Sequence, residues 1–437
     1  MKKFKLSTVF LLVFVLLIGL VGCSSGEEAS TEPEEETTEE TTTTEEEAVD
    51  LGGRALKFAN HWDMTPEGGT EYGDLTVEYF EKVQEKYNVS VEYVVVPFEE
   101  KVNQLTTSIL AGEPFADLVW LDSTQAAQLI QQDYLIPLDD ILDLNTIKMS
   151  DAQKQMYTID GKVYMFGHQL NQSGGMYYNK TMFEQAGLPD PYELQQKGEW
   201  TWEAMLEAAK KLTTGDTYGL SADPNLLMEY LIATNDAYVL NPETYEVELD
   251  SENAMEALEF MYALYNEHKV IKPNEGNNWE DPRNYFTEGL VGMTQGWVWE
   301  AEGRADTPFE WGYVFWPKGP KADDYVTPTS SVEGFTIPVG VEDPEIVYRI
   351  WEEMQVWEMA ESSVIEWFET VLPSEETIDT ATQMLTKVKT DFWKAYNLED
   401  AFYEMNDNIA RGVETPAQAV AKVLEQAQAR VDDFLNK

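Results

Sequence analysis

The chain has 437 residues and a formal charge of −52 at neutral pH. A chain this acidic argues against nucleic-acid binding, because phosphate contacts need clustered Lys and Arg side chains. Only six arginines occur in it, which disfavours sites that clamp phosphate with paired guanidinium groups. A single cysteine excludes internal disulfides, so the fold must depend on a buried apolar core.

The N-terminus has the pattern of an export signal. Three lysines are followed by an unbroken apolar run from Val9 to Gly22, which is too short to cross a bilayer comfortably. The run ends in Leu20-Val21-Gly22-Cys23, which resembles the bacterial lipobox, where cleavage precedes a cysteine that carries lipid. We therefore expect 1–22 to be a lipoprotein signal peptide and Cys23 to be the lipidation site. A retained, uncleaved anchor is the alternative.

The next segment, 24–50, consists almost entirely of Glu, Thr and Ser and carries twelve of the negative charges. It has too little apolar surface to offset the entropy of ordering. Together with Cys23 it predicts a lipidated, disordered acidic tether over 23–50. The expected location is the extracellular face of the cell membrane, held by the lipid anchor.

The body then alternates between short strand patterns and helix patterns. Strands are expected at 55–59, 89–96 and 117–121, and helices at 75–87, 102–110 and 125–132. Such alternation indicates βαβ units and a mainly parallel sheet covered by helices. The sequence therefore predicts an α/β fold.

Helices are marked more clearly in the second half. Thr201 is a candidate cap for a helix over 202–212, and apolar residues follow helical spacing over 253–268. A long pattern from 415 to 435 has Pro416 at its expected first helical position.

Signals for catalysis or metal binding are weak. The chain lacks the common nucleophile, phosphate-loop and zinc motifs, and its three histidines are widely spaced. We therefore expect no catalytic residue, no metal and no cofactor.

Aromatic residues beside turns carry more information. Trp62 follows the first strand and precedes the glycine-containing loop 66–69, and Trp297 and Trp299 follow an expected strand over 290–294. An aromatic face suits the C–H face of a sugar ring, whose hydroxyl groups seek hydrogen bonds. Packing in the core is the competing interpretation. Trp120, Trp202, Trp351 and Trp357 lie within regular patterns and are expected to be core residues.

Several segments together resemble the extracellular solute-binding proteins of ABC importers, in the group that includes maltose-binding protein. The segment 116–122 is similar to that group's "PDVV" strand, and 134–139 to its "PLD" segment. The segments 160–164 and 175–180 are similar to its crossover between lobes. Further matches lie at 183–189, 200–203, 286–293 and 334–338. The crossover departs from the pattern because no proline occurs in Met165-Phe166-Gly167-His168-Gln169.

This resemblance implies a periplasmic-binding-protein-like fold with two hinged lobes, each built on a central, mainly parallel sheet. The expected N-terminal lobe is 51–165 plus 300–342, and the expected C-terminal lobe is 166–299 plus 343–437. The ligand would lie in the cleft between them.

The resemblance also implies a set of ligand-contacting positions. Four aromatic residues are expected to stack on the ligand, and four polar residues are expected to exchange hydrogen bonds with it: Trp62, Tyr177, Trp297 and Trp299, and Asp122, Gln169, Asn171 and Glu333.

The predicted function is that of a lipid-anchored receptor that delivers a sugar, most simply an oligosaccharide, to an ABC permease. The expected partners are the sugar, the permease subunits and the membrane through the anchor, but not nucleic acid, and the receptor is expected to be a monomer. The same fold with a peptide or polyamine ligand, an extracellular carbohydrate-active enzyme, and a sensory receptor remain as alternatives.

Overall fold

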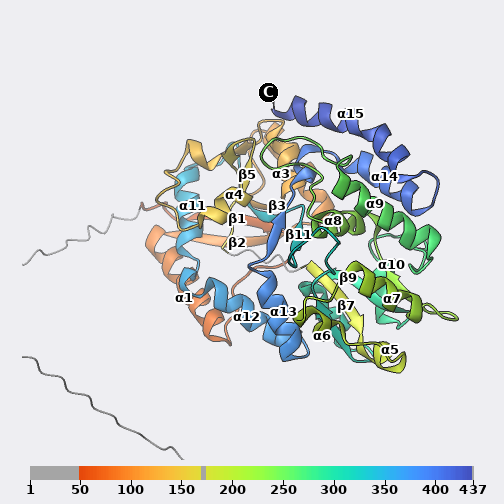
Figure 1. Cartoon of the computed structure of the whole chain (residues 1–437). Coiled ribbons are helices and arrows are strands. Elements are labelled where there is room, and N and C mark those ends of the chain that lie inside the picture. The colour runs from red at the N-terminus through yellow and green to blue at the C-terminus, as the bar shows by residue number, and fades with distance from the viewer. Residues whose placement is uncertain (1–48, 169–173, 436–437) are drawn as a thin grey trace, which may run out of the picture. The chain divides into compact units, whose positions relative to one another are not determined.

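The computed structural model describes residues 49–168 and 174–435. In this part of the chain the strands form two main sheets and two small ones (Figure 1). The first main sheet has the order β2-β1-β3-β12-β4, from Val89–Val95, Arg54–Asn60, Leu118–Asp122, Glu333–Pro338 and Leu135–Ile136. The second has the order β10-β7-β9-β8, from Trp311–Val314, Gly174–Asn179, Val291–Trp297 and Tyr218–Ser221.

The first sheet is parallel over β2, β1 and β3, and β12 then runs antiparallel to β3. In the second sheet, β8 is parallel to β9, whereas β7 is antiparallel to both β9 and β10. The small sheets pair β5 with β6 and β11 with β13, from Thr158–Ile159, Lys162–Val163, Thr327–Thr329 and Val388–Thr390.

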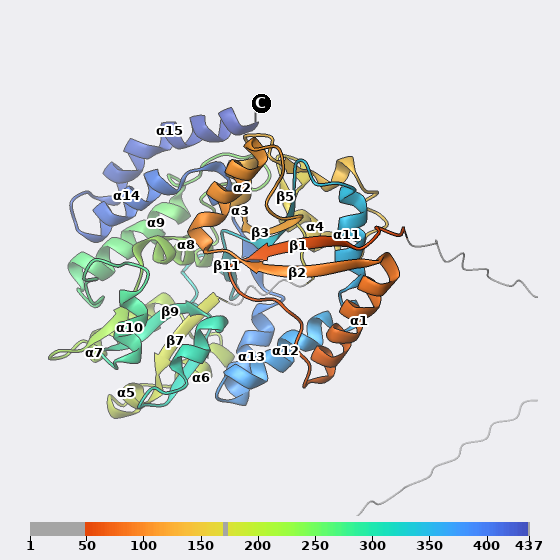
Figure 2. The same cartoon turned by 180° about the vertical axis from the view of Figure 1, so that it is seen from behind.

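Helices surround the sheets, and Figures 1 and 2 show α1, α4 and α11 around the first sheet and α5, α7 and α10 around the second. The helices of the first half are α1 Glu71–Tyr87, α2 Lys101–Leu110, α3 Ser123–Ile130, α4 Asp151–Met156, α5 Lys180–Gln185, α6 Pro191–Gln196, α7 Trp202–Leu212 and α8 Pro224–Thr234. Those of the second half are α9 Glu252–Tyr262, α10 Asp281–Thr287, α11 Pro344–Glu353, α12 Ala360–Val371, α13 Glu375–Met384, α14 Glu399–Ala410 and α15 Pro416–Leu435. Short 3-10 segments and one π-helical segment, η3, complete the helical elements: η1 to η6 lie at Phe98–Glu100, Leu138–Asp140, Ala263–Glu267, Val298–Arg304, Trp357–Met359 and Trp393–Tyr396.

Local sequence signals explain where several helices begin. Thr201 accepts a hydrogen bond from the Ala204 amide at the start of α7, as predicted. The Asp223 carboxylate caps α8 in the same way, with Pro224 at its first position. The predicted first position of α15, Pro416, is also confirmed. No helix among the described residues combines the length and apolarity needed to cross a membrane.

The strands are distributed differently from the predicted lobe boundaries. β10 lies within the range 300–342 assigned to the N-terminal lobe, yet it pairs with β7 in the second sheet. The chain returns to the first sheet only after β11, at 330–333, and α11 packs against α1 beside the first sheet. The boundaries near 300 and 343 therefore need correction. Pairing partners decide which sheet a short strand joins, and hydrophobic pattern alone does not reveal them.

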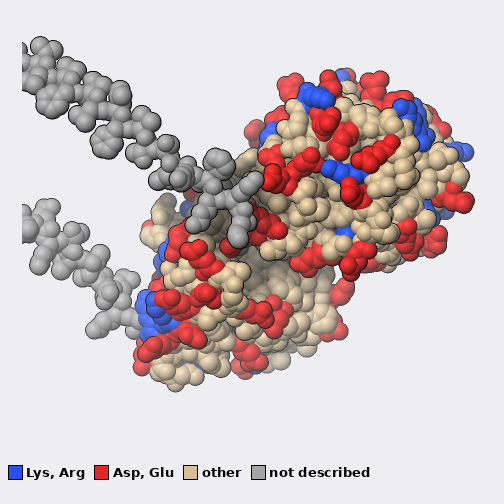
Figure 3. All heavy atoms as spheres, turned by 90° about the horizontal axis from the view of Figure 1, so that it is seen from below, with Lys and Arg blue, Asp and Glu red and all other residues tan. Residues whose placement is uncertain are grey.

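The described surface is strongly acidic. On the face in Figure 3, Asp and Glu side chains far outnumber Lys and Arg side chains. The apolar residues lie instead in a continuous core that includes aromatic residues such as Phe58, Tyr178 and Trp316.

Candidate functional site

The first sheet brings three of the predicted site residues to one edge. Trp62 follows β1, Asp122 ends β3 and Glu333 begins β12. Parallel strands present their carboxyl ends at the same edge, where ligands bind in α/β sheets. Because β12 is antiparallel to β3, its first residue Glu333 pairs directly with Asp122. The sheet topology therefore explains why Asp122 and Glu333, which are 211 positions apart in the chain, come together.

Trp62 is the exposed member of this group, with 42% of its surface accessible. Its ring makes edge contacts with His61 and Trp120, at centroid distances of 4.3 and 5.7 Å. The indole nitrogen of Trp120 in turn donates a hydrogen bond to Glu333 Oε2 at 3.2 Å. Trp120 was predicted to be core and is only partly buried. Trp62 offers a free aromatic face at this edge.

A buried lysine lies beneath these side chains. Lys101 Nζ donates to the carbonyl oxygen of Trp120 at 2.8 Å, and burial lowers the pKa of Lys101 to about 8. Burial also raises the pKa of the Asp122 and Glu333 carboxyl groups, an effect that Lys101 partly offsets. The pKa of His61 falls to about 4, chiefly through desolvation, so that this ring is neutral at pH 7.

Asp122 also has a structural role that the sequence did not reveal. Its Oδ1 accepts a hydrogen bond from the amide of Gln125 at 2.7 Å and caps α3, with the Gln125 side chain completing a capping box. One of its two oxygens is therefore committed to the helix.

The second sheet carries a larger tryptophan cluster at the end of β9. The rings of Trp297 and Trp299 are stacked, with centroids 6.1 Å apart and an interplanar angle of 13°. Trp297 is the last residue of β9, and Trp299 lies in the 3-10 segment η4 that follows it. Trp279 joins the cluster at 5.7 Å from Trp297. We call Trp279, Trp297 and Trp299 the tryptophan cluster.

Trp279 was missed by sequence reasoning. It lies in the polar segment 274–281 before α10, and 45% of its surface is exposed. A large aromatic residue within an otherwise polar loop is a signal that could have indicated a binding role.

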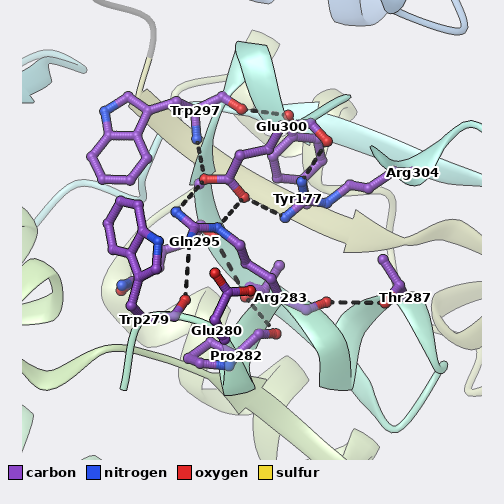
Figure 4. Close-up of polar contacts among 12 residues, drawn as sticks. Tyr177, Trp279, Glu280, Pro282, Arg283, Thr287, Gln295, Trp297, Glu300 and Arg304 are labelled. Carbon is purple, nitrogen blue, oxygen red and sulfur yellow. Dashed lines mark hydrogen bonds and ion pairs between the residues drawn. The ribbon is translucent and has the colours of Figure 1, made fainter. Parts of the chain in front are cut away.

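A buried carboxylate holds the tryptophan cluster. Glu300 accepts a hydrogen bond from the Trp297 amide at 3.1 Å, and forms ion pairs with Arg283 at 3.0 Å and Arg304 at 2.7 Å. Figure 4 shows Glu300 between the two tryptophans Trp279 and Trp297 on one side and Arg304 on the other. No motif in the sequence indicates this arrangement.

Arg283 links Glu300 to the exposed tryptophans. Its Nη1 donates to the carbonyl oxygen of Trp279 at 3.0 Å. Its guanidinium carbon lies 3.7 Å from the ring centroid of Trp279 and 5.3 Å from that of Trp299. Such cation–π contacts fix ring orientation as well as contributing attraction.

The prediction for Tyr177 needs correction. This residue is fully buried in β7, and its ring is covered by Tyr313, Trp311 and the guanidinium group of Arg304, at 4.6, 5.3 and 3.8 Å. Its hydroxyl group donates to the carbonyl oxygen of Trp297 at 2.6 Å. Tyr177 therefore supports the tryptophan cluster from behind and offers no free face for stacking. Inward-facing aromatic residues on central strands look the same in sequence as ligand contacts.

A pocket opens beside the cluster. It is lined by Asp223, Leu226, Trp279, Pro282, Arg283, Gln295, Trp297 and Glu300. Burial is the main cause that raises the pKa of the Asp223 carboxyl group to about 6, while its hydrogen bond from the Asn225 amide acts in the opposite direction. The pocket thus combines aromatic faces with hydrogen-bond acceptors.

Three predicted positions, Cys23, Gln169 and Asn171, lie outside the described residues. Among the residues that are described, no group of His, Cys, Asp and Glu side chains has the arrangement of a metal site.

Comparison with known families identifies the class of protein. A family model described as "Bacterial extracellular solute-binding protein" matches residues 67–352. The chain belongs to this family. Among individual relatives of this solute-binding protein, "Putative binding protein BAB2_0491" of Brucella abortus (strain 2308) is 28% identical over 236 residues, which cover 51% of the chain and 55% of the relative. The match thus spans about half the length of that relative.

Two further relatives have sugar-related names. The "Arabinooligosaccharide-binding protein" of Halalkalibacterium halodurans is 24% identical over 46% of the chain and 45% of the relative. The "Maltodextrin-binding protein MdxE" of Bacillus subtilis is 24% identical over 62% of the chain and 67% of the relative.

Solved structures confirm the predicted fold. The GacH receptor of Streptomyces glaucescens aligns with a TM-score of 0.67 at 18% identity, over 87% of the chain and 99% of the receptor. The substrate-binding protein Lmo0181 of Listeria monocytogenes aligns with a TM-score of 0.64 at 18% identity, over 88% and 99%. The solute-binding protein therefore has the two-lobed, periplasmic-binding-protein-like α/β fold that the sequence predicted.

Proposed function

We propose that this solute-binding protein is the lipid-anchored receptor of an ABC importer and binds an oligosaccharide between its two lobes. The observation that carries the proposal is the presence of exposed tryptophan faces at both sheets. Trp62 lies at the first sheet, and the tryptophan cluster lies at the second. Sugar rings stack on such faces, and the carboxylates of Glu333 and Asp223 lie beside them as acceptors for hydroxyl groups.

The relatives support the same ligand class. Maltodextrin and arabino-oligosaccharides appear in the names of two of them, and GacH and Lmo0181 were solved with acarbose and with cycloalternan. Burying one tryptophan ring against the ligand contributes about 1.5–3 kcal/mol of binding free energy. Two or three such rings therefore supply much of the roughly 8 kcal/mol that a micromolar dissociation constant requires.

Delivery would follow from closure of the lobes. A ligand that contacts both tryptophan surfaces binds the closed form better than the open form and so shifts the population towards closure. The closed form would then engage the permease. Lipid on Cys23, followed by the acidic segment 24–50, would keep the receptor near that permease.

A titration of residues 51–437, followed by intrinsic tryptophan fluorescence, tests the binding proposal. The panel contains di- to hexasaccharides, short peptides and polyamines. We expect saturable changes with a sugar and no turnover of that sugar on prolonged incubation. Saturation by peptides or polyamines alone would reject the sugar assignment, and turnover would indicate an enzyme.

The anchor is tested separately on the full chain expressed in a bacterial host. Mass spectrometry of the membrane fraction should find a mature protein beginning at a diacylated Cys23. In a Cys23→Ala variant the lipid should be absent. An unmodified Cys23 in the mature wild-type protein would contradict the proposal.

A peptide or polyamine ligand is the second candidate, because carboxylates gather near the site. Asp122, Glu333, Asp223 and Glu399 all have raised pKa values, and in each case burial is the first cause. A cationic ligand would stabilise the charged form of these buried carboxylates.

A further inference from the structure

Gln295 is a buried polar residue with an unused acceptor. It lies in β9 opposite Met176 of β7, only 4% of its surface is exposed, and it lines the pocket beside the tryptophan cluster. Its side-chain nitrogen donates one long hydrogen bond, at 3.4 Å, to the carbonyl oxygen of Asp223. Its Oε1 has no hydrogen-bond partner among the described residues.

An unpaired buried acceptor is costly, because it has lost water without gaining a replacement. Most buried polar atoms in proteins are paired, so an exception at the wall of a pocket calls for an explanation. A ligand that brings a hydroxyl donor to Oε1 would supply the missing partner. The two aromatic residues of the same pocket, Trp279 and Trp297, would cover the apolar face of that ligand.

The charges of the pocket argue against an anionic ligand. Arg283 is the single cation among its lining residues, and it is already engaged. Its Nη2 donates a hydrogen bond to Glu300 Oε1, its Nη1 donates to the Trp279 carbonyl oxygen, and its Nε lies 3.0 Å from Glu300 Oε2 in the ion pair. A carboxylate on the ligand would face Asp223 without a free guanidinium group to pair with it.

The same contacts disfavour a cation in this pocket. The Arg283 guanidinium already lies over the Trp279 ring, so that a second cation would meet like charge there. Glu300 is neutralised by Arg283 and Arg304 together. An uncharged group with hydroxyl donors fits the lining best.

We propose that Gln295 is a specificity-determining residue whose Oε1 accepts a hydrogen bond from an uncharged sugar unit held against Trp279 and Trp297. The pocket then discriminates against sugar units in which a carboxylate replaces a primary hydroxyl group. This inference rests on the proposed function. It adds that the sugar is uncharged and that Gln295 is a residue that recognises it. Sites that use a buried acceptor in this way reject ligands that lack the matching donor.

Two glutamines provide a matched comparison. In the proposed site, Gln295→Met removes an acceptor that the free protein does not use, together with one long hydrogen bond to the Asp223 carbonyl oxygen. In the control, Gln195→Met removes a carboxamide that is fully engaged, since Gln195 accepts from the Phe315 amide at 2.7 Å and donates to Thr380 Oγ1 at 3.2 Å. Gln195 is equally buried but does not line the pocket.

The experiment measures thermal stability and, by calorimetry, affinity for the neutral oligosaccharide that binds best. Gln295→Met should keep or raise the melting temperature and weaken binding about tenfold or more. Gln195→Met should lower the melting temperature and leave the affinity unchanged. The wild-type protein should bind the same oligosaccharide at least about tenfold more weakly after its primary hydroxyl groups are oxidised to carboxylates.

Each result bears on the inference. If the wild type binds a sugar but Gln295→Met binds it equally well, or the oxidised sugar binds as tightly as the neutral one, the inference is overturned and the proposed function stands. If no neutral sugar binds the wild type at all, the proposed function fails and takes the inference with it.

Discussion

The tryptophan surfaces at the two sheets are held in place by different kinds of contact. At the first sheet, Trp62 touches its neighbours His61 and Trp120 through ring edges. At the second, the tryptophan cluster is connected to Glu300, which carries two ion pairs and a backbone hydrogen bond. Turning Trp62 would break only these ring-edge contacts, whereas moving the chain at Trp297 would break the hydrogen bond from its amide to Glu300.

This difference suggests a division of labour in binding. A rigid surface loses little entropy when the ligand arrives, so it favours a defined orientation of the sugar. The side chain of Trp62, which has fewer contacts, can adjust to a ligand that the rigid surface has already positioned. We therefore expect changes at the second surface to affect both folding and binding, and changes at Trp62 to affect binding alone.

The largest expected effect comes from Glu300→Gln. The substitution leaves Arg304, which is 2% exposed, without its charged partner, and breaking a buried ion pair on one side costs about 3–5 kcal/mol of unfolding free energy. Chemical denaturation measures the loss. The exposed neighbour Glu302 is the control, since Glu302→Gln should stay within about 0.5 kcal/mol of the wild type. Equal stability of the two variants would show that Glu300 does not hold the cluster.

The next effect concerns how the stability of the protein depends on pH through Asp223, which lines the pocket at the second sheet. Burial raises the pKa of Asp223 from 3.8 to about 6, so the folded state disfavours its charged form. This destabilisation is fully present above pH 6 and disappears as pH falls below about 3.8. Two pKa units correspond to about 3 kcal/mol as an upper bound. Asp223→Asn keeps a side chain that can cap α8 and should therefore be more stable than wild type at pH 8.

Denaturation of both proteins at a series of pH values measures this difference. The stability gap between Asp223→Asn and wild type should narrow steadily from pH 7 to pH 4. A gap that stays constant over that range would mean that Asp223 titrates normally and is not desolvated by the fold.

The third effect is on affinity and compares the two surfaces directly. Removing the ring in Trp62→Ala or Trp299→Ala should weaken sugar binding by about 1.5–3 kcal/mol each, because either ring is more than two-fifths exposed and free to contact a ligand. Calorimetric titration measures the loss. Trp62→Ala should leave the melting temperature almost unchanged, whereas Trp299→Ala should lower it by removing the stacking contact with Trp297. The exposed residue Leu110 at the end of α2 supplies the control, since Leu110→Ala should not alter affinity.

The fold was largely predictable because its local signals agree with its tertiary structure. β1, α1, β2, α2, β3 and α3 all occur within a few residues of their predicted bounds, and α7 occurs at 202–212 as predicted. Periodicity and capping residues such as Thr201 report local conformation, which sequence shows directly. The sheet that β10 joins depends on distant partners, and sequence does not show those.

The candidate site was predictable only in part, for the same reason. Trp62 follows a strand, Trp297 ends one and Glu333 begins one, so their place at sheet edges could be inferred from order along the chain. Tyr177 also lies in a strand, but its side chain faces inward. Its burial depends on the distant residues that pack against it, which the sequence does not show. Trp279 and Gln295 line the same pocket because α10 packs against β9. No sequence motif indicates this contact.

The smallest expected effect comes from the support behind the tryptophan cluster. Tyr177→Phe removes the hydroxyl group that donates to the Trp297 carbonyl oxygen and leaves the rest of the buried ring in place. Loss of one such hydrogen bond should cost about 1 kcal/mol of unfolding free energy, and a small fall in sugar affinity should follow because Trp297 is less firmly held. The control is Tyr313→Phe, which removes the hydroxyl group that donates to the neighbouring Gly296 carbonyl oxygen and should cost similar stability. If Tyr177→Phe weakened binding by as much as Trp299→Ala, the tyrosine would contact the ligand directly, and its assignment as a buried support would be wrong.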